Sequence, residues 1–130
     1  MNRKNFERQV AEALDALPSW IAGKMGNLAV VVEDRPSRSK CRELGVDYRE
    51  GLLGLYEGRS LLEREPGAME GPSRIVLYRQ MIETEARDRL TLPRVIRETL
   101  AHEIAHHVGM TEEQIEEALD EKDRVRRGAV

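Results

Sequence analysis

The 130-residue sequence has a single cysteine, Cys41, and no long apolar run. One cysteine cannot form an intramolecular disulfide, so a packed core must stabilise the fold. Apolar runs such as residues 28–32 are far shorter than the roughly 20 residues of a membrane-spanning helix. The first residues, MNRKNFERQV, also lack the apolar stretch of a secretory signal. We therefore expect a soluble protein of the reducing cytoplasm.

An excess of one charge is also missing, because 21 Lys and Arg residues face 24 Asp and Glu residues. No strong overall field would attract nucleic acid or an anionic membrane, and neither is expected as a partner. Hydrophobic residues make up 40% of the chain, which suffices for a packed interior and argues against disorder. No linker or repeat divides the sequence, so we expect one domain over residues 1–130.

The hydrophobic pattern predicts an α+β domain in the order α-β-β-β-α-α. Apolar spacing of three and four predicts a helix over about residues 5–17. The continuous apolar run of residues 27–33 predicts an interior strand, and residues 52–56 and 74–79 predict an antiparallel hairpin. The alternation from Arg74 to Arg79 is typical of a half-exposed strand near an edge, along which an extended peptide or protein substrate could bind.

The remaining segments carry weaker patterns. Residues 38–50 are charged without a sustained period, which predicts a surface loop with room for one short helical turn. The Gly- and Pro-rich residues 57–72 suit either a flap or a passive hairpin loop. A short helix is expected over about residues 83–89. Thr111 followed by Gln114 matches a capping box and predicts a last helix to about residue 122.

A principal helix is predicted from Pro93 to about residue 108, and Gly109 should end it. Apolar residues at positions 96, 100 and 104 should face the core. On the opposite side, residues 102–106 read His-Glu-Ile-Ala-His, the HExxH pattern. Because helix positions four apart share a face, His102 and His106 can bind one ion, with Glu103 beside them.

This pattern indicates metal-assisted hydrolysis. A zinc ion held by two histidines and one carboxylate keeps a fourth position for water, whose pKa it lowers toward about 7. Glu103 would take the water's proton and then deliver it to the departing amine. The alternative is that His102 and His106 simply end a helix, where the helix dipole favours cationic side chains.

The third ligand is open, because several acidic residues follow the turn at Gly109. The candidates are Glu112, Glu113, Glu116, Glu117 and Asp120. Glu112 is favoured, since it occupies the place of the last histidine in the long metzincin motif HExxHxxGxxH. An acidic residue just after the Thr111 cap would also suit a helix N-terminus without any metal.

Three further polar residues are candidates for supporting roles. His107 points about 100° away from His106 around the helix, which favours packing or support behind the ligands over ligation or oxyanion stabilisation. Tyr56 and Tyr78 could donate to a tetrahedral oxyanion if their hydroxyls reach the cleft, although tyrosines on strands more often pack. Cys41 has no local ligand partner and is excluded.

Residues 99–110, TLAHEIAHHVGM, resemble the small bacterial zincin-like metallopeptidases, as do residues 51–58 and 74–79. The resemblance implies a minimal zincin fold, in which a small mixed sheet packs on helices and the active-site helix lies beneath a strand that could bind substrate. It also implies His102, His106 and Glu112 as ligands of one zinc ion and Glu103 as the base. It implies no particular substrate.

Three functions are compatible with these patterns. The leading prediction is a zinc-dependent metallopeptidase that hydrolyses peptide bonds through a metal-activated water. The second is a noncatalytic, metal-stabilised module that binds peptides or proteins. The least favoured is a metal-dependent endoribonuclease similar to the bacterial enzymes of ribosomal RNA maturation, which lack a glutamate after the first histidine. Glu103 and the negative net charge argue against it.

Overall fold

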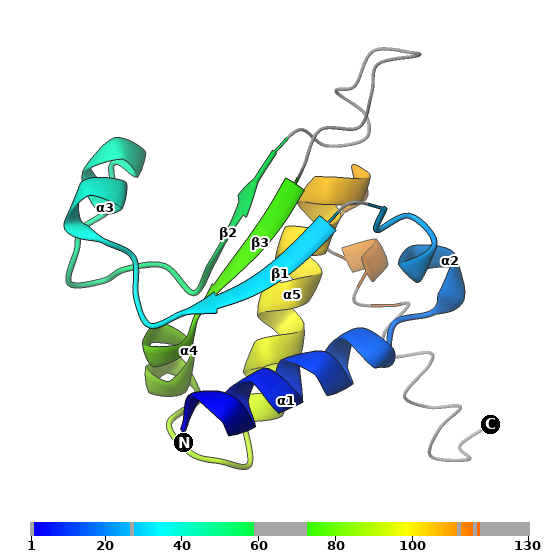
Figure 1. The fold of residues 1–130 in the computed structure, drawn as a ribbon, viewed down its shortest axis with the longest axis horizontal. Coiled ribbons are helices and arrows are strands. Elements are labelled where there is room, and N and C mark those ends of the chain that lie inside the picture. The colour runs from blue at the N-terminus through cyan, green and yellow to red at the C-terminus, as the bar shows by residue number, and fades with distance from the viewer. Residues whose placement is uncertain (1, 27, 59–72, 112, 116, 118–130) are drawn as a thin grey trace.

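The computed structural model describes residues 2–26, 28–58, 73–111, 113–115 and 117 (Figure 1). The predicted α+β class is confirmed, with a small mixed sheet packed against helices. The elements in chain order are α1 (Arg3–Asp15), α2 (Ser19–Ala22), β1 (Leu28–Glu33), α3 (Arg38–Leu44), β2 (Gly54–Glu57), β3 (Ser73–Tyr78), α4 (Arg79–Ala86) and α5 (Leu92–Val108).

The three strands form one sheet in the order β1-β3-β2. β1 pairs in parallel with β3, and β2 pairs antiparallel with it, which confirms the predicted hairpin. Two expectations were wrong: among the described strands β1 lies at an edge of the sheet, and the strand of residues 74–79 lies at its centre. β3 is the central strand, and both of its edges are already paired.

The two faces of β3 are both buried, which explains why its alternation is misleading. Ile75 and Leu77 belong to the main hydrophobic core, which also contains buried residues of α1 and α5. Val76 and Tyr78 are also buried, at 0% and 2% exposure, on the opposite face of the sheet. Within the strand only Arg74 is exposed. The core face of β3 is therefore the face turned toward α5.

Helix α5 runs through the middle of the molecule and contacts α1, α4, β2 and β3. It has a proline in its first turn and ends at Gly109, whose φ of 74° is the left-handed conformation that glycine adopts freely. Ile96, Leu100 and Ile104 are at most 3% exposed. The predicted start, end and core-facing side of this helix are confirmed.

The capping box after α5 is present as predicted. The Thr111 backbone N–H donates to Gln114 Oε1 (3.0 Å), and the Gln114 N–H donates back to Thr111 Oγ1 (3.2 Å). Ile115, one residue later, is fully buried in the core. The end of this helix and most of the 57–72 segment lie outside the described residues.

Three helices differ from the expectations. α3 forms within the segment predicted as a loop, between a Ser37 N-cap, whose hydroxyl accepts the Lys40 N–H, and a left-handed Gly45. α4 begins four residues before the expected start of 83 and ends before Arg87, whose φ is 67°. α2 was not predicted. No described helix is long and apolar enough to cross a membrane.

Candidate metal centre

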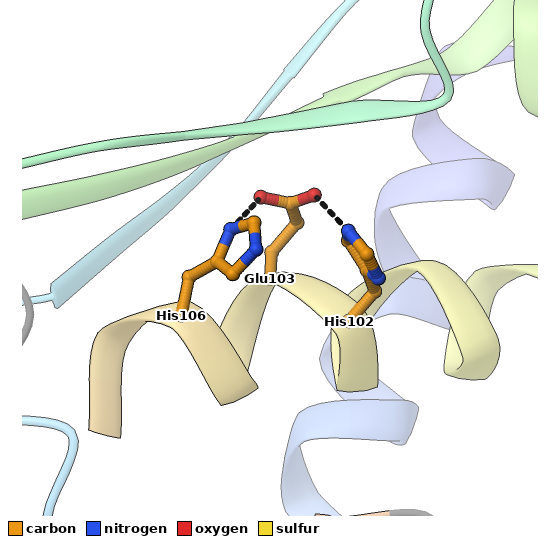
Figure 2. Close-up of side chains that lie close together, drawn as sticks. All are labelled: His102, Glu103 and His106. Carbon is orange, nitrogen blue, oxygen red and sulfur yellow. Dashed lines mark ion pairs between the residues drawn. The ribbon is translucent and has the colours of Figure 1, made fainter. Parts of the chain in front are cut away.

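The HExxH side chains come together on one side of α5 (Figure 2). His102, Glu103 and His106 each offer a ligand atom, and these atoms all lie within 4.8 Å of one another. Glu103 Oε1 is 3.8 Å from His102 Nε2, and Oε2 is 3.6 Å from His106 Nδ1. The carboxylate therefore lies between the two imidazoles, with one oxygen toward each.

Burial differs sharply among the three side chains. The histidine side chains are 49% and 55% exposed, whereas that of Glu103 is 7% exposed. A carboxylate removed from water is costly unless polar or cationic groups compensate it. Both imidazoles lie close enough to do so, and a cation held beside them would do so more strongly. The donor types fit zinc, which takes imidazole nitrogen and carboxylate oxygen.

Strand β2 lies close to Thr99 and Glu103 of α5 because residue 54 is a glycine. A Cβ atom on Gly54 would lie 2.9 Å from Thr99 Cγ2, 3.2 Å from the Val76 carbonyl oxygen and 3.5 Å from Glu103 Cγ. Real Cβ atoms essentially never approach as closely as the first distance, so a side chain at residue 54 would force β2, α5 or the Thr99 side chain to shift. Sequence reasoning did not single out Gly54, although a glycine inside a strand is a signal of close backbone approach.

His107 is buried on another side of α5 from the candidate ligands and joins three parts of the chain. Its Nε2 lies 3.2 Å from the Met25 carbonyl oxygen, and its Nδ1 lies 2.8 Å from the Tyr56 hydroxyl on β2. A carbonyl only accepts, so Nε2 carries a proton, and in the neutral tautomer with this proton Nδ1 accepts from the Tyr56 hydroxyl. The ring centroid of Tyr56 is also 6.4 Å from that of His106, in an edge-on arrangement.

Tyr78 is not brought to this group. It follows Val76 on the face of β3 that points away from α5. Burial, with a smaller effect of the nearby Glu33 and Glu57 carboxylates, raises the pKa of Tyr78 to about 12. The phenol is therefore a neutral packing residue at physiological pH. Cys41, also excluded from the site, is buried in α3.

A cleft of about 710 Å³ opens beside the histidine–glutamate group. Its floor is α5, including Thr99, His102 and Glu103. One wall is the chain leading into β2, from Leu52 to Gly54, and the other is the end of α4 with the following turn. Glu103 thus borders a cavity of the size that binds small molecules or peptide segments.

The family model for zincin-like metallopeptidases matches residues 25–121, from just before β1 to beyond α5. The chain belongs to this family. The match covers most of the sequence and confirms the resemblance carried by the HExxH segment. No curated protein sequence matches the chain at a significant level.

In this zincin-like chain the acidic residues after Gly109 remain candidates for the third ligand. Glu112, the favoured residue, lies outside the described residues, as do Glu116 and Asp120. Glu113 and Glu117 are described and exposed. The left-handed turn at Gly109 and the capping box at Thr111 define where this acidic segment begins.

Proposed function

We propose that this zincin-like protein is a zinc-dependent metallopeptidase. His102 and His106 would hold the ion, together with an acidic residue after Gly109, for which Glu112 is the first candidate. The observation that carries the proposal is the Glu103 carboxylate, which is buried between two exposed imidazoles and lines the cleft. A helix that merely ended in histidines would not need a buried glutamate between them.

Glu103 is suited to move a proton within the cleft. When bound, zinc supplies a Lewis acid that lowers the pKa of a water molecule and polarises the substrate carbonyl. Glu103 would accept the proton of that water on a carboxylate oxygen and donate it to the nitrogen of the departing amine. β2 lies against the Glu103 side chain at Gly54, and Glu103 lines the cleft in which the substrate would bind.

The substrate backbone has a different candidate strand from the one expected. Both edges of β3 are paired, so residues 74–79 cannot accept a peptide by strand addition. Among the described strands β2 pairs only with β3, which leaves its other edge available, and β2 lies over Glu103. We propose that an extended peptide lies in the cleft beside this edge.

The charges of the cleft favour a peptide over a nucleic acid. Its acidic residues are Glu85, Asp88, Glu98 and Glu103, and its arginines are Arg87 and Arg94. Nucleic-acid sites require an excess of cations to neutralise phosphates. This balance argues against the endoribonuclease alternative.

Cleavage of a mixed peptide library by the zinc-loaded protein, followed by mass spectrometry, tests the peptidase directly. We expect cleavage by the wild type, a loss of at least about a hundredfold in Glu103→Gln, and no change in the matched control Glu12→Gln, which is exposed on α1. A zinc-loaded wild type that cleaves no peptide would support the noncatalytic binding module instead.

A further inference from the structure

A hydrogen-bonded pair, Tyr56 and His107, lies directly beside the candidate metal ligands. The Tyr56 hydroxyl is 2.8 Å from His107 Nδ1, and His107 Nε2 is 3.2 Å from the carbonyl oxygen of Met25, just before β1. The His107 side chain is almost completely buried, at 2% exposure. Because both ring nitrogens are bonded, His107 cannot turn without breaking a buried hydrogen bond. It therefore holds the Tyr56 phenol in a fixed place.

Strand β2 brings Tyr56 to this place by following α5. Gly54 and Tyr56 are two residues apart on the strand, so both face α5. The strand advances about 6.6 Å between them, and α5 advances about 6 Å between Glu103 and His107. The close approach of Gly54 to Glu103 therefore places Tyr56 at the height of His107, beside His106.

The Tyr56 ring contacts both neighbouring histidines. Its centroid is 5.5 Å from that of His107 and 6.4 Å from that of His106, where the two rings meet edge-on at 63°. Both distances are within the range of interacting aromatic pairs. The His106 side chain is 55% exposed, and an exposed imidazole can adopt several rotamers. Contact with Tyr56 restricts this imidazole on the side of β2, while its Nδ1 lies 3.6 Å from Glu103 Oε2.

We propose that Tyr56 and His107 are positioning residues of the candidate metal centre. The hydrogen bond between them fixes the Tyr56 ring, and this ring orients the His106 imidazole for zinc. A ligand that is already held in its bound direction loses less conformational entropy when the ion binds, so the zinc affinity is higher. The inference rests on the proposed zinc site, and both residues act through His106 and not at the reacting atoms.

Variants at residues 56 and 107 separate the two hydrogen bonds of His107. Tyr56→Phe keeps the ring and removes the hydroxyl. His107→Gln keeps an N–H donor for the Met25 carbonyl but has no acceptor in place of Nδ1, whereas His107→Asn has an amide oxygen near the position of Nδ1 that accepts from Tyr56. Tyr78→Phe removes a buried hydroxyl from the opposite face of the sheet and is the matched control.

Competition with a zinc-binding dye measures the zinc affinity of each variant, under conditions in which urea unfolding shows it to be folded. We expect Tyr56→Phe and His107→Gln to bind zinc about tenfold more weakly than the wild type, and His107→Asn and Tyr78→Phe to stay within about threefold. In the zinc-free protein, NMR should show NOEs between the rings of Tyr56 and His106. These NOEs should be retained in Tyr78→Phe and weakened in His107→Gln.

Zinc affinity within about threefold of the wild type in both Tyr56→Phe and His107→Gln would overturn the positioning role. An equal loss in Tyr78→Phe would also overturn it, because general destabilisation would then explain the effect. If the affinities change as expected but the wild type cleaves no peptide, the peptidase proposal fails and the positioning role stands. A wild type that binds no zinc would overturn both the zinc site and the positioning role.

Discussion

At the scale of single residues, the site depends on the different surroundings of three side chains on α5. Glu103 is buried between β2 and the imidazoles, while His102 and His106 are about half exposed and His102 also lines the cleft. A base must be held firmly next to the reacting atoms, whereas metal ligands must leave room for water and substrate. The HExxH spacing allows a buried glutamate beside exposed histidines. His102, one residue before Glu103, and His106, three residues after it, point in other directions around the helix than Glu103 does.

Tyr56→Phe separates a structural role of the phenol from a catalytic one. Loss of the hydroxyl leaves the buried Nδ1 of His107 without its donor, so we expect the free energy of unfolding in urea to fall by about 1–3 kcal/mol. Because the hydroxyl proton is directed to His107, kcat should fall by less than about tenfold. A stable variant with a loss of about 10²–10³ in kcat would instead identify Tyr56 as an oxyanion donor.

Tyr78 should make stability fall at high pH. Its pKa is raised to about 12 in the folded protein, while an unfolded tyrosine titrates near about 10. The unfolded state therefore loses the proton first, and the contribution present below pH about 10 is lost as the pH rises toward about 12. Urea unfolding over this range should show the decline, and Tyr78→Phe should flatten it. An equal decline in Tyr78→Phe would contradict this assignment.

Of the site, the residues within HExxH were predictable because a helix fixes their relative directions from local spacing alone. The 100° offset of His107 from His106 also agrees with its burial on another side of α5. The partners of these residues were not predictable: Tyr56, Met25 and Gly54 meet α5 from positions about 50 to 80 residues away in sequence. The local pattern of a sequence cannot specify such contacts. For the same reason it could not distinguish Tyr56, which contacts His107, from Tyr78, which points away from α5.

At the scale of elements, the helices with strong periodicity were predicted and the order of strands was not. α1 and α5 have apolar faces that local spacing reveals. The ends of α5 agree with the prediction to about one residue, whereas α1 begins and ends two residues earlier than expected. β1 has the more continuous apolar run, yet β3 is the central strand. Strand order depends on which strands pair across the fold, and local sequence does not specify this pairing. The helix α3 was also missed, because its sequence is mostly charged although it contains the buried Cys41.

The close approach of β2 to α5 can be tested at Gly54. Gly54→Ala places a Cβ 2.9 Å from Thr99 Cγ2, so we expect a loss of about 1–3 kcal/mol in the free energy of unfolding and a lower kcat as β2 shifts over Glu103. Thr99→Ser removes that methyl group but retains the hydroxyl that donates to the Val95 carbonyl. The double variant should therefore recover part of both losses. Purely additive effects would show that the two residues do not meet.

At the scale of the whole molecule, the candidate metal centre and the core share one helix. One side of α5 buries Ile96, Leu100 and Ile104 against the sheet and α1, while another carries His102 and His106. The α+β class followed from the sequence because periodicity distinguishes helices from strands. The cleft could not be predicted from the sequence, because its walls come from β2 and from the α4–α5 turn, which only the complete fold brings to α5.

Zinc should therefore stabilise the folded protein. A ligand that binds only the native state at about a hundred times its Kd adds about 2.7 kcal/mol, which for a chain of this size raises the Tm by roughly 8 °C. Differential scanning calorimetry with added zinc and then with a chelator measures this shift. His102→Ala/His106→Ala should show no shift, and a similar shift in that variant would mean that zinc binds elsewhere.

The most direct test of the account is the zinc content of Glu103→Gln compared with His106→Gln, measured by elemental analysis of purified, zinc-reconstituted protein. If the histidines are ligands and Glu103 is a base, the wild type and Glu103→Gln should each retain about one zinc ion per chain, and His106→Gln should lose most of it. Loss of zinc from Glu103→Gln as complete as from His106→Gln would make Glu103 a ligand, and a wild type that binds no zinc would contradict the metal centre itself.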